Sequence, residues 1–399
     1  MKKDLNLKYT LLFGGGAIRG VAYCGAFKAL EEFNFRYDTI AGSSVGAIFA
    51  GLVAVGYTAD EIRDIMFKIN YELFKDIQLA ISPQFALCKG EVFLDWMREL
   101  IEKKFYGQNY QKGKNKAVTF SDIEKNLVII TTDLSNFECK EFSKKETPDF
   151  EIATAVRISC AMPGLMKPIE YNNTLLVDGD LQKSAPMWSL TKTLQPGNER
   201  VLEFRLEGDF QGNDHNAVEY INALYSYATS TGTKFLTQIY GCRDDYDYIT
   251  IDTGDVNIVD FNIPEEKRAE LVNRGYNQAL NYITKDLKAK KVNLLKIYKK
   301  MDLLLSALEK NLSKAKISEA KCNLGELYIE LCDNINIINS YEKTELVKFK
   351  NIFLENIKNP ILFGQTKLSN EKLVQAQFMQ LKQSIQSRIS EYEDFLSTI

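Results

Sequence analysis

The chain has 399 residues, of which 45% are hydrophobic and 26% are charged, a composition that is typical of globular domains and excludes a mainly disordered protein. The formal net charge of -3 provides no basic surface and argues against nucleic acid as the main partner. The charge is uneven, because residues 285–399 carry 19 Lys and Arg against 14 Asp and Glu, net +5, whereas residues 1–284 carry 31 against 39, net -8.

The cysteines and the N-terminus bear on the compartment. The seven cysteines are widely scattered and include no C-x-x-C pair, so they predict neither a disulfide framework nor a zinc knuckle and favour a reducing compartment. The first residues lead into a β-rich run without the apolar segment of a secretory signal. The sequence therefore predicts a cytoplasmic protein, and it leaves secretion without an N-terminal signal peptide open.

Strand-like apolar runs alternate with helical spacing through the first 290 residues. The predicted strands are residues 8–13, a strand ending at residue 41, 118–120, 126–132, one around 169, 175–177, 201–205 and 248–251. The predicted helices are residues 17–33, 45–55, one opened by the capping box Thr58-Ala59-Asp60-Glu61, 91–105, 150–158, 217–240 and 265–287. This alternation predicts an α/β fold, a doubly wound core with a mainly parallel sheet.

Strand signals vanish after about residue 290, which predicts a C-terminal all-helical extension with breaks near residue 314, at 334–340 and at 359–370. We therefore expect two domains, residues 1–290 and residues 291–399. Lysines between Lys285 and Lys300 interleave with apolar residues. This basic amphipathic pattern fits either a surface that binds anionic lipid or the solvated face of a bundle helix.

The segment Gly42-Ser43-Ser44-Val45-Gly46 fits the G-x-S-x-G pattern of a nucleophile elbow. Glycines on either side of the serine let the strand and the helix approach closely, and Ser44 is the candidate nucleophile. The alternative is a membrane span over residues 39–57 with Gly42 and Gly46 as a helix-pairing face. The glycines and serines of that window make a poor apolar helix, so the sequence favours a buried strand-turn-helix.

A glycine-rich loop, Gly14 to Gly20, joins the first strand to the first helix. The dinucleotide pattern G-x-G-x-x-G fails in every register, and no Walker sequence is present. Backbone N–H groups where such a loop enters a helix favour negative charge, so the loop is predicted to stabilise an oxyanion. An upstream glycine loop followed by G-x-S-x-G is the arrangement of serine esterases.

The general base is constrained by composition, because the chain has a single histidine, His215. It lies in a polar segment and is expected to be a surface or capping residue. The order Ser44, Asp178, His215 is nevertheless that of an α/β-hydrolase triad, and this alternative stays open. Against it, an elbow at residue 44 leaves room for only two preceding strands, too few for such a sheet.

Residues ~8–287 resemble the patatin-like phospholipase family. The resemblance is carried by four segments in the same order, Gly14 to Gly20 with the helix that follows, Gly42 to Gly46, Ala155 to Gly164, and Leu176-Val177-Asp178-Gly179. It implies a Ser-Asp dyad in which Ser44 is the nucleophile and Asp178 the base. The implied oxyanion hole is the backbone of Gly15, Gly16, Ala17 and Arg19. It also implies that Arg157 is buried near the site.

Two positions depart from the family pattern. Ala17 stands where many members have glycine, which is minor because the backbone N–H remains. Asp180 stands where Gly or Ala is usual, and a second carboxylate beside Asp178 is expected to raise the pKa of the base.

The resemblance implies a patatin-like lipid acyl hydrolase of the phospholipase A type. No metal is expected, since the sequence has no H-E-x-x-H and no dense Asp/Asn loop, and no cofactor is expected. The expected substrate is a phospholipid membrane surface, with no nucleic acid partner. An activator ligand or protein and a homo-oligomer formed through the helical extension remain open. Two other classes also remain open: a ligand- or partner-switched effector, in bacterial anti-phage signalling or directed at a host, and a catalytically silent scaffold.

Overall fold

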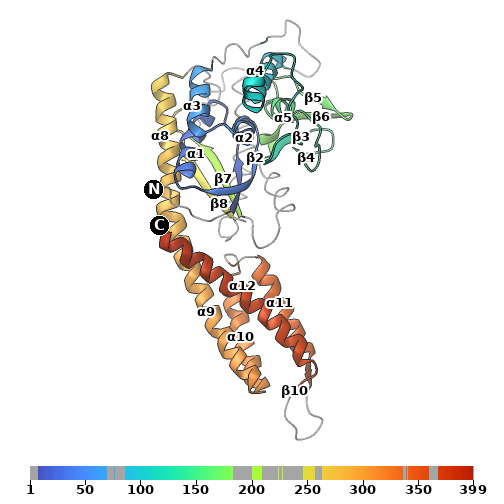
Figure 1. Cartoon of the computed structure of the whole chain (residues 1–399), viewed down its shortest axis with the longest axis vertical. Helices are drawn as coiled ribbons and strands as arrows, with labels where there is room; N and C mark the ends of the chain where they lie inside the picture. The colour runs from blue at the N-terminus through green and yellow to red at the C-terminus, as the bar shows by residue number, and fades with distance from the viewer. Residues whose placement is uncertain are drawn as a thin grey trace. The chain divides into compact units, whose positions relative to one another are not determined.

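The structure is a computed structural model that describes residues 8–69, 76, 86–182, 200–208, 223, 227, 246–256, 263–335, 338, 340–358 and 367–398 (Figure 1). The described residues form two compact units, one up to Tyr282 and one from Ile283 onward.

The first unit is built on one mixed sheet, which has eight strands in the described residues. Five strands run parallel in the order β3-β2-β1-β7-β8, namely β3 (Asn126–Asp133), β2 (Arg36–Gly42), β1 (Lys8–Phe13), β7 (Arg200–Glu207) and β8 (Tyr246–Asp252). Three strands pair antiparallel at the β3 end, namely β4 (Glu138–Ser143), β5 (Ile169–Tyr171) and β6 (Thr174–Asp178). The predicted α/β fold with a mainly parallel sheet is confirmed.

Two details of the strand prediction were wrong. Residues 118–120 form no strand, and only an isolated bridge joins Thr119 to Glu151. Strand β4 was missed because its sequence ECKEFS is mostly polar and its first residues are exposed or half-buried, so its apolar alternation is weak. It forms because it pairs along its whole length with the apolar strand β3.

The strand order explains where a site can form. The chain proceeds from β1 through β2 to β3 in one direction and from β7 to β8 in the other, so the order reverses beside β1. Ligands of open α/β sheets bind outside the carboxyl ends of the strands at such a reversal. The glycine loop follows β1 and the serine elbow follows β2, so both lie at this position.

The helices of the first unit are η1 (Ala17–Val21), α1 (Ala22–Glu32), α2 (Val45–Ala54), α3 (Ala59–Lys68), α4 (Glu91–Tyr106), η3 (Gly107–Asn109), α5 (Ile152–Ser159), η4 (Gly179–Gln182) and α8 (Glu265–Asn281). The longer helices lie in segments that the sequence predicted to be helical, whereas the short turns η3 and η4 were not predicted. Helices α1 and α8 lie side by side (Figure 1). A Cβ on Gly25 would lie 1.8 Å from the carbonyl oxygen of Val272, so the two backbones meet where only glycine fits.

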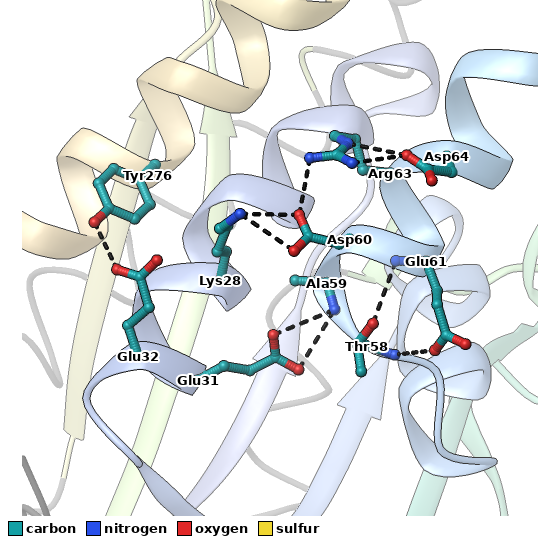
Figure 2. A network of polar contacts seen from close by, with 10 residues as sticks. All are labelled: Lys28, Glu31, Glu32, Thr58, Ala59, Asp60, Glu61, Arg63, Asp64 and Tyr276. Carbon is teal, nitrogen blue, oxygen red and sulfur yellow. Dashed lines mark hydrogen bonds and ion pairs between the residues drawn. The ribbon is translucent and has the colours of Figure 1, made fainter. Parts of the chain in front are cut away.

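Polar contacts tie α1 to its neighbours (Figure 2). The Lys28 ammonium reaches Asp60 of α3 at 3.0 Å, and the Tyr276 hydroxyl of α8 donates to Glu32 at 2.7 Å. The predicted capping box is confirmed, because the Glu61 N–H donates to the Thr58 hydroxyl and the Thr58 N–H donates to the Glu61 carboxylate. These contacts are mostly exposed, so they orient the helices more than they stabilise them.

The core beneath the glycine loop is aromatic. The ring of Phe13, the last residue of β1, stacks on Phe204 of β7 with centroids 4.5 Å apart and lies 4.8 Å from Phe49 of α2. The Tyr23 hydroxyl donates to the carbonyl of Gly14 at 2.8 Å. Gly14, the first residue of the loop, is therefore hydrogen-bonded to a side chain of the packed aromatic cluster.

The second unit is a bundle of α9 (Leu287–Ser313), α10 (Ile317–Asp333), α11 (Ser340–Glu355) and α12 (Glu371–Thr398) (Figure 1). A π-helical turn, η5 (Tyr282–Asp286), precedes α9, so the segment predicted as one helix over residues 265–287 is α-helical to Asn281 and then π-helical. The extension is not entirely helical, because β9 (Ile357–Lys358) pairs with β10 (Lys367–Leu368). This pair is too short to produce a strand signal in the sequence.

The basic amphipathic stretch turns its apolar side into this bundle. Leu294, Ile297 and Met301 belong to the bundle core, so they present no free apolar face. Lys291 is fully buried with its ammonium 4.8 Å from the Tyr392 ring, and Lys299 pairs with Glu393 at 2.6 Å. The contacts support the interpretation of this stretch as a bundle helix.

Among the described helices, none has the length and apolar character needed to span a bilayer. Residues 39–57, considered above as a span, instead form the end of β2, the serine turn and α2.

Candidate active site

Ser44 sits at a sharp turn between β2 and α2. Its φ of 53° and ψ of -127° match the first central residue of a type II′ turn, a conformation that favours glycine. The flanking glycines are required by close approach, since a Cβ on Gly42 would lie 2.2 Å from the Gly46 oxygen and one on Gly46 would lie 2.0 Å from the Phe13 oxygen. The G-x-S-x-G spacing therefore forms an elbow that holds a strained serine at the start of a helix.

The segment after α5 supports the elbow. The Ser44 N–H donates to the Ser159 hydroxyl at 3.0 Å, and that hydroxyl donates to the Ile130 carbonyl at 2.6 Å. The Cys160 thiol donates to the Ser44 carbonyl at 3.2 Å. Sequence reasoning gave Ser159 and Cys160 no individual role, although both lie in the Ala155 to Gly164 segment that carries part of the resemblance.

Ser44 opens into an apolar pocket of about 150 Å³. The walls come from helices that are distant in sequence, with Met66 and Ile69 at the end of α3, Phe93 and Trp96 on α4, and Met166 after α5. The complete lining is Ala17, Ser44, Val45, Ile48, Met66, Ile69, Cys88, Phe93, Trp96, Cys160, Met162, Leu165, Met166 and Asp178. The proposed nucleophile and the proposed base thus line one cavity.

Asp178 ends β6 and is 1% exposed. Its main chain is fixed on both sides, because its N–H donates to the Ala161 carbonyl at 3.0 Å and its carbonyl accepts from the Thr132 hydroxyl at 2.9 Å. Asp178 lines the same pocket as Ser44, which is the placement that a dyad requires.

The four backbone N–H groups assigned to the oxyanion hole are not equivalent. The Gly15 N–H donates to the Asp180 carboxylate at 2.9 Å, and the Arg19 N–H donates to the Gly16 carbonyl at 3.1 Å. Within the described part of the chain, the N–H groups of Gly16 and Ala17 have no hydrogen-bond partner. Ala17 also lines the pocket, so these two groups are the available donors of the loop.

A further donor was missed by sequence reasoning. The N–H of Val45, the first residue of α2, has no hydrogen-bond partner among the described residues, and Val45 lines the pocket. The positive end of the α2 dipole lies at the same position. The signal was present, because the residue after the serine of a nucleophile elbow commonly supplies an oxyanion donor.

Arg157 lies next to the pocket and holds its walls, and the half-buried Cys160 lines it. The Arg157 guanidinium, 2% exposed, donates to the carbonyls of Lys89 and Lys167 at 2.5 and 2.7 Å, and each of those residues adjoins a pocket residue. Burial lowers the pKa of Arg157. Burial, with the nearby Asp178 charge, raises the pKa of the Cys160 thiol well above its usual value, so this thiol is neutral.

The alternative base, His215, is not tested by the described residues. His215 lies outside the described residues, as does the predicted helix 217–240 apart from residues 223 and 227. In the described part, no group of three His, Cys, Asp or Glu side chains is arranged to hold a metal ion.

Comparison with known proteins now bears on this site. Residues 11–190 match the family described as Patatin-like phospholipase. Residues 11–190 form a patatin-like phospholipase domain. The chain is 28% identical over 284 residues to the uncharacterized protein YqhO of Bacillus subtilis, covering 66% of this chain and 94% of YqhO. It is 31% identical over 190 residues to the probable lipid hydrolase 463L of Invertebrate iridescent virus 6, covering 46% of this chain and 64% of the viral protein.

Among solved structures, VipD from Legionella pneumophila aligns over 97% of this chain and 90% of its own, with 15% identity and a TM-score of 0.41. The family assignment therefore rests on the sequence match and not on this alignment.

Proposed function

We propose that this patatin-like chain is a lipid acyl hydrolase of the phospholipase A type, which cleaves fatty-acyl esters of membrane phospholipids through an acyl-enzyme on Ser44. The main support for this proposal is that Ser44 and Asp178 line one pocket whose other walls are mostly apolar. An apolar cavity of about 150 Å³ can hold a benzene molecule, so this pocket accommodates a hydrocarbon segment of about six carbons. An ester attached to that segment lies beside the nucleophile.

The proposed reaction uses two residues and the backbone. Asp178 accepts the proton of the Ser44 hydroxyl as the oxygen attacks the ester carbonyl carbon. The N–H groups of Gly16, Ala17 and Val45 stabilise the negative carbonyl oxygen, and the α2 dipole adds to this effect. Asp178 then returns the proton to the departing alcohol, which leaves the acyl group on Ser44.

Deacylation repeats these steps with water. Asp178 takes a proton from a water molecule, the water oxygen attacks the acyl-enzyme, and the fatty acid departs as Ser44 recovers its proton. The neutral Cys160 thiol is a poor competing nucleophile, because the thiolate is the reactive form.

The test combines Ser44→Ala and Asp178→Asn with assays on phospholipid vesicles and on a soluble short-chain ester. Each variant is expected to lose hydrolysis, and the double variant should be no worse than either single, since members of one catalytic unit are not additive. Asp133→Asn is the matched control, because Asp133 is also buried at a strand end but lies outside the pocket. Hydrolysis that survives Ser44→Ala would refute the proposal.

A fluorophosphonate probe separates the remaining alternatives. Labelling of Ser44 in the isolated protein supports the hydrolase, and labelling only after a ligand or protein is added indicates a switched effector. Absence of labelling under all conditions indicates a silent scaffold. His215→Ala should leave turnover within about a few fold, whereas a loss near three orders of magnitude would establish a triad.

A further inference from the structure

Asp180 connects three segments of the site. It lies in η4, directly after β6, and is 3% exposed. Its Oδ1 atom accepts one hydrogen bond from the Gly15 N–H at 2.9 Å and another from the Ser43 hydroxyl at 3.1 Å. Gly15 belongs to the glycine loop after β1, and Ser43 precedes the nucleophile after β2. One carboxylate oxygen therefore joins the loop to the elbow.

Asp180 also contacts the proposed base. Its backbone N–H donates to Oδ1 of Asp178 at 2.8 Å, which fixes the orientation of that carboxylate. The fit on the loop side is tight, because a Cβ on Gly15 would lie 2.6 Å from Cγ of Asp180. Glycine at position 15 and aspartate at position 180 thus fit each other closely.

The contact decides which loop atoms face the substrate. Because the Gly15 N–H points at Asp180, it is unavailable to a carbonyl oxygen in the pocket. The N–H groups of Gly16 and Ala17, which have no partner among the described residues, remain. Gly16 has a φ of 152° and Ala17 a φ of 48°, so the loop backbone departs from the ordinary negative φ range directly after Gly15.

We propose that Asp180 is a positioning residue that fastens the glycine loop to the nucleophile elbow and leaves Gly16 and Ala17 as the oxyanion donors of that loop. This inference rests on the proposed hydrolase function, because the donors matter only if an oxyanion forms. The Gly15 N–H then anchors the loop to Asp180, so the loop has the conformation needed for catalysis before substrate binds.

The first test compares Asp180→Ala with Asp180→Asn on a soluble short-chain ester. Asparagine keeps an oxygen that can accept from Gly15 and Ser43, so it should retain kcat within about five-fold. Alanine releases the loop, and displaced donors should lower kcat by about 10–100-fold with KM changed by less than about three-fold, since small displacements of catalytic groups act on the transition state. Asp133→Ala, which removes the hydrogen bonds donated to this buried carboxylate by the N–H groups of Ser135 and Asn136, is the control and should keep kcat.

A second test disrupts the Gly15–Asp180 contact by changing Gly15 to alanine. Its Cβ should displace the Asp180 carboxylate, so Gly15→Ala and Asp180→Ala should lower kcat to a similar extent, and the double variant should be no worse than either single. Losses that multiply would show that the two residues act separately and would overturn the inference.

Hydrogen exchange followed by mass spectrometry tests the inference without any turnover. Peptides containing Gly15 should exchange faster in Asp180→Ala than in wild type, with Asp180→Asn close to wild type. Unchanged exchange in Asp180→Ala, or full kcat in that variant, overturns the inference. A wild-type protein that hydrolyses no ester refutes the proposed function, and the exchange result still decides whether Asp180 holds the loop.

Discussion

The strained turn at Ser44 leads to a stability prediction that is independent of catalysis. Ser44 adopts φ 53° and ψ -127°, where a side chain clashes with its own backbone and glycine does not. Such strain costs about 1–3 kcal/mol, whereas glycine adds about 0.5–1 kcal/mol of backbone entropy to the unfolded state. Ser44→Gly should therefore be more stable than Ser44→Ala by about 1 kcal/mol, although both lack the nucleophile.

The comparison with alanine isolates the strain, because both variants lose the hydroxyl and only alanine keeps the Cβ. For a folding unit of this size, about 1 kcal/mol corresponds to a rise in Tm of about 2–4 °C. Urea unfolding followed by tryptophan fluorescence measures the difference, since Trp96 lines the pocket beside the elbow. Ala47→Gly is the control, because Ala47 lies in α2 with ordinary helical geometry and should lose about 1 kcal/mol. If Ser44→Gly is no more stable than Ser44→Ala, the turn stores no strain.

Two further predictions concern the Glu151 carboxylate and the Cys160 thiol. Burial disfavours the charged Glu151 carboxylate, but hydrogen bonds from Arg98, at 2.6 and 2.9 Å, and from a neighbouring threonine hold the pKa of Glu151 below its usual value. Because the pKa of Glu151 is lower in the folded state, its ionised carboxylate stabilises the fold at pH values above the unfolded-state pKa of about 4.3. This stabilisation is lost as the pH falls through the folded-state pKa. Glu151→Gln should therefore lower the free energy of unfolding, measured in urea, by about 0.5–1 kcal/mol at pH 7 and by progressively less below pH 4. The control Asp95→Asn, at an exposed carboxylate, should leave it unchanged at both pH values. A loss of stability that persists at low pH would contradict the ion-pair explanation. Because burial raises the pKa of Cys160, iodoacetamide at pH 8 should modify the exposed Cys322 well before it, and equal rates in peptide mass spectrometry would contradict a neutral thiol.

Local patterns in the sequence determined the elements and the elbow. The glycine spacing around Ser44 predicts a tight turn, and the structure shows the physical reason. A Cβ on Gly42 would clash with the backbone oxygen of Gly46, and a Cβ on Gly46 would clash with the backbone oxygen of Phe13 in the adjacent strand. The capping box at Thr58 and the helical periodicity of α1, α2 and α4 are equally local, and the structure has them where the sequence predicted them. Strand β4 lacked such a signal because its pairing with β3, and not its own residues, makes it a strand.

The tertiary structure alone decided how the loop atoms are used and what surrounds the serine. The sequence treats Gly15, Gly16 and Ala17 as equal donors, but a carboxylate 165 residues further along the chain takes the first of them. Ser159, which fixes the Ser44 backbone from 115 residues away, had no local signature either. Periodicity reports which side of an element is buried, whereas the partner of a hydrogen bond depends on how distant strands are ordered in the sheet. The roles of Asp180, Ser159 and the pocket walls therefore follow from sheet order and packing, which no local spacing encodes.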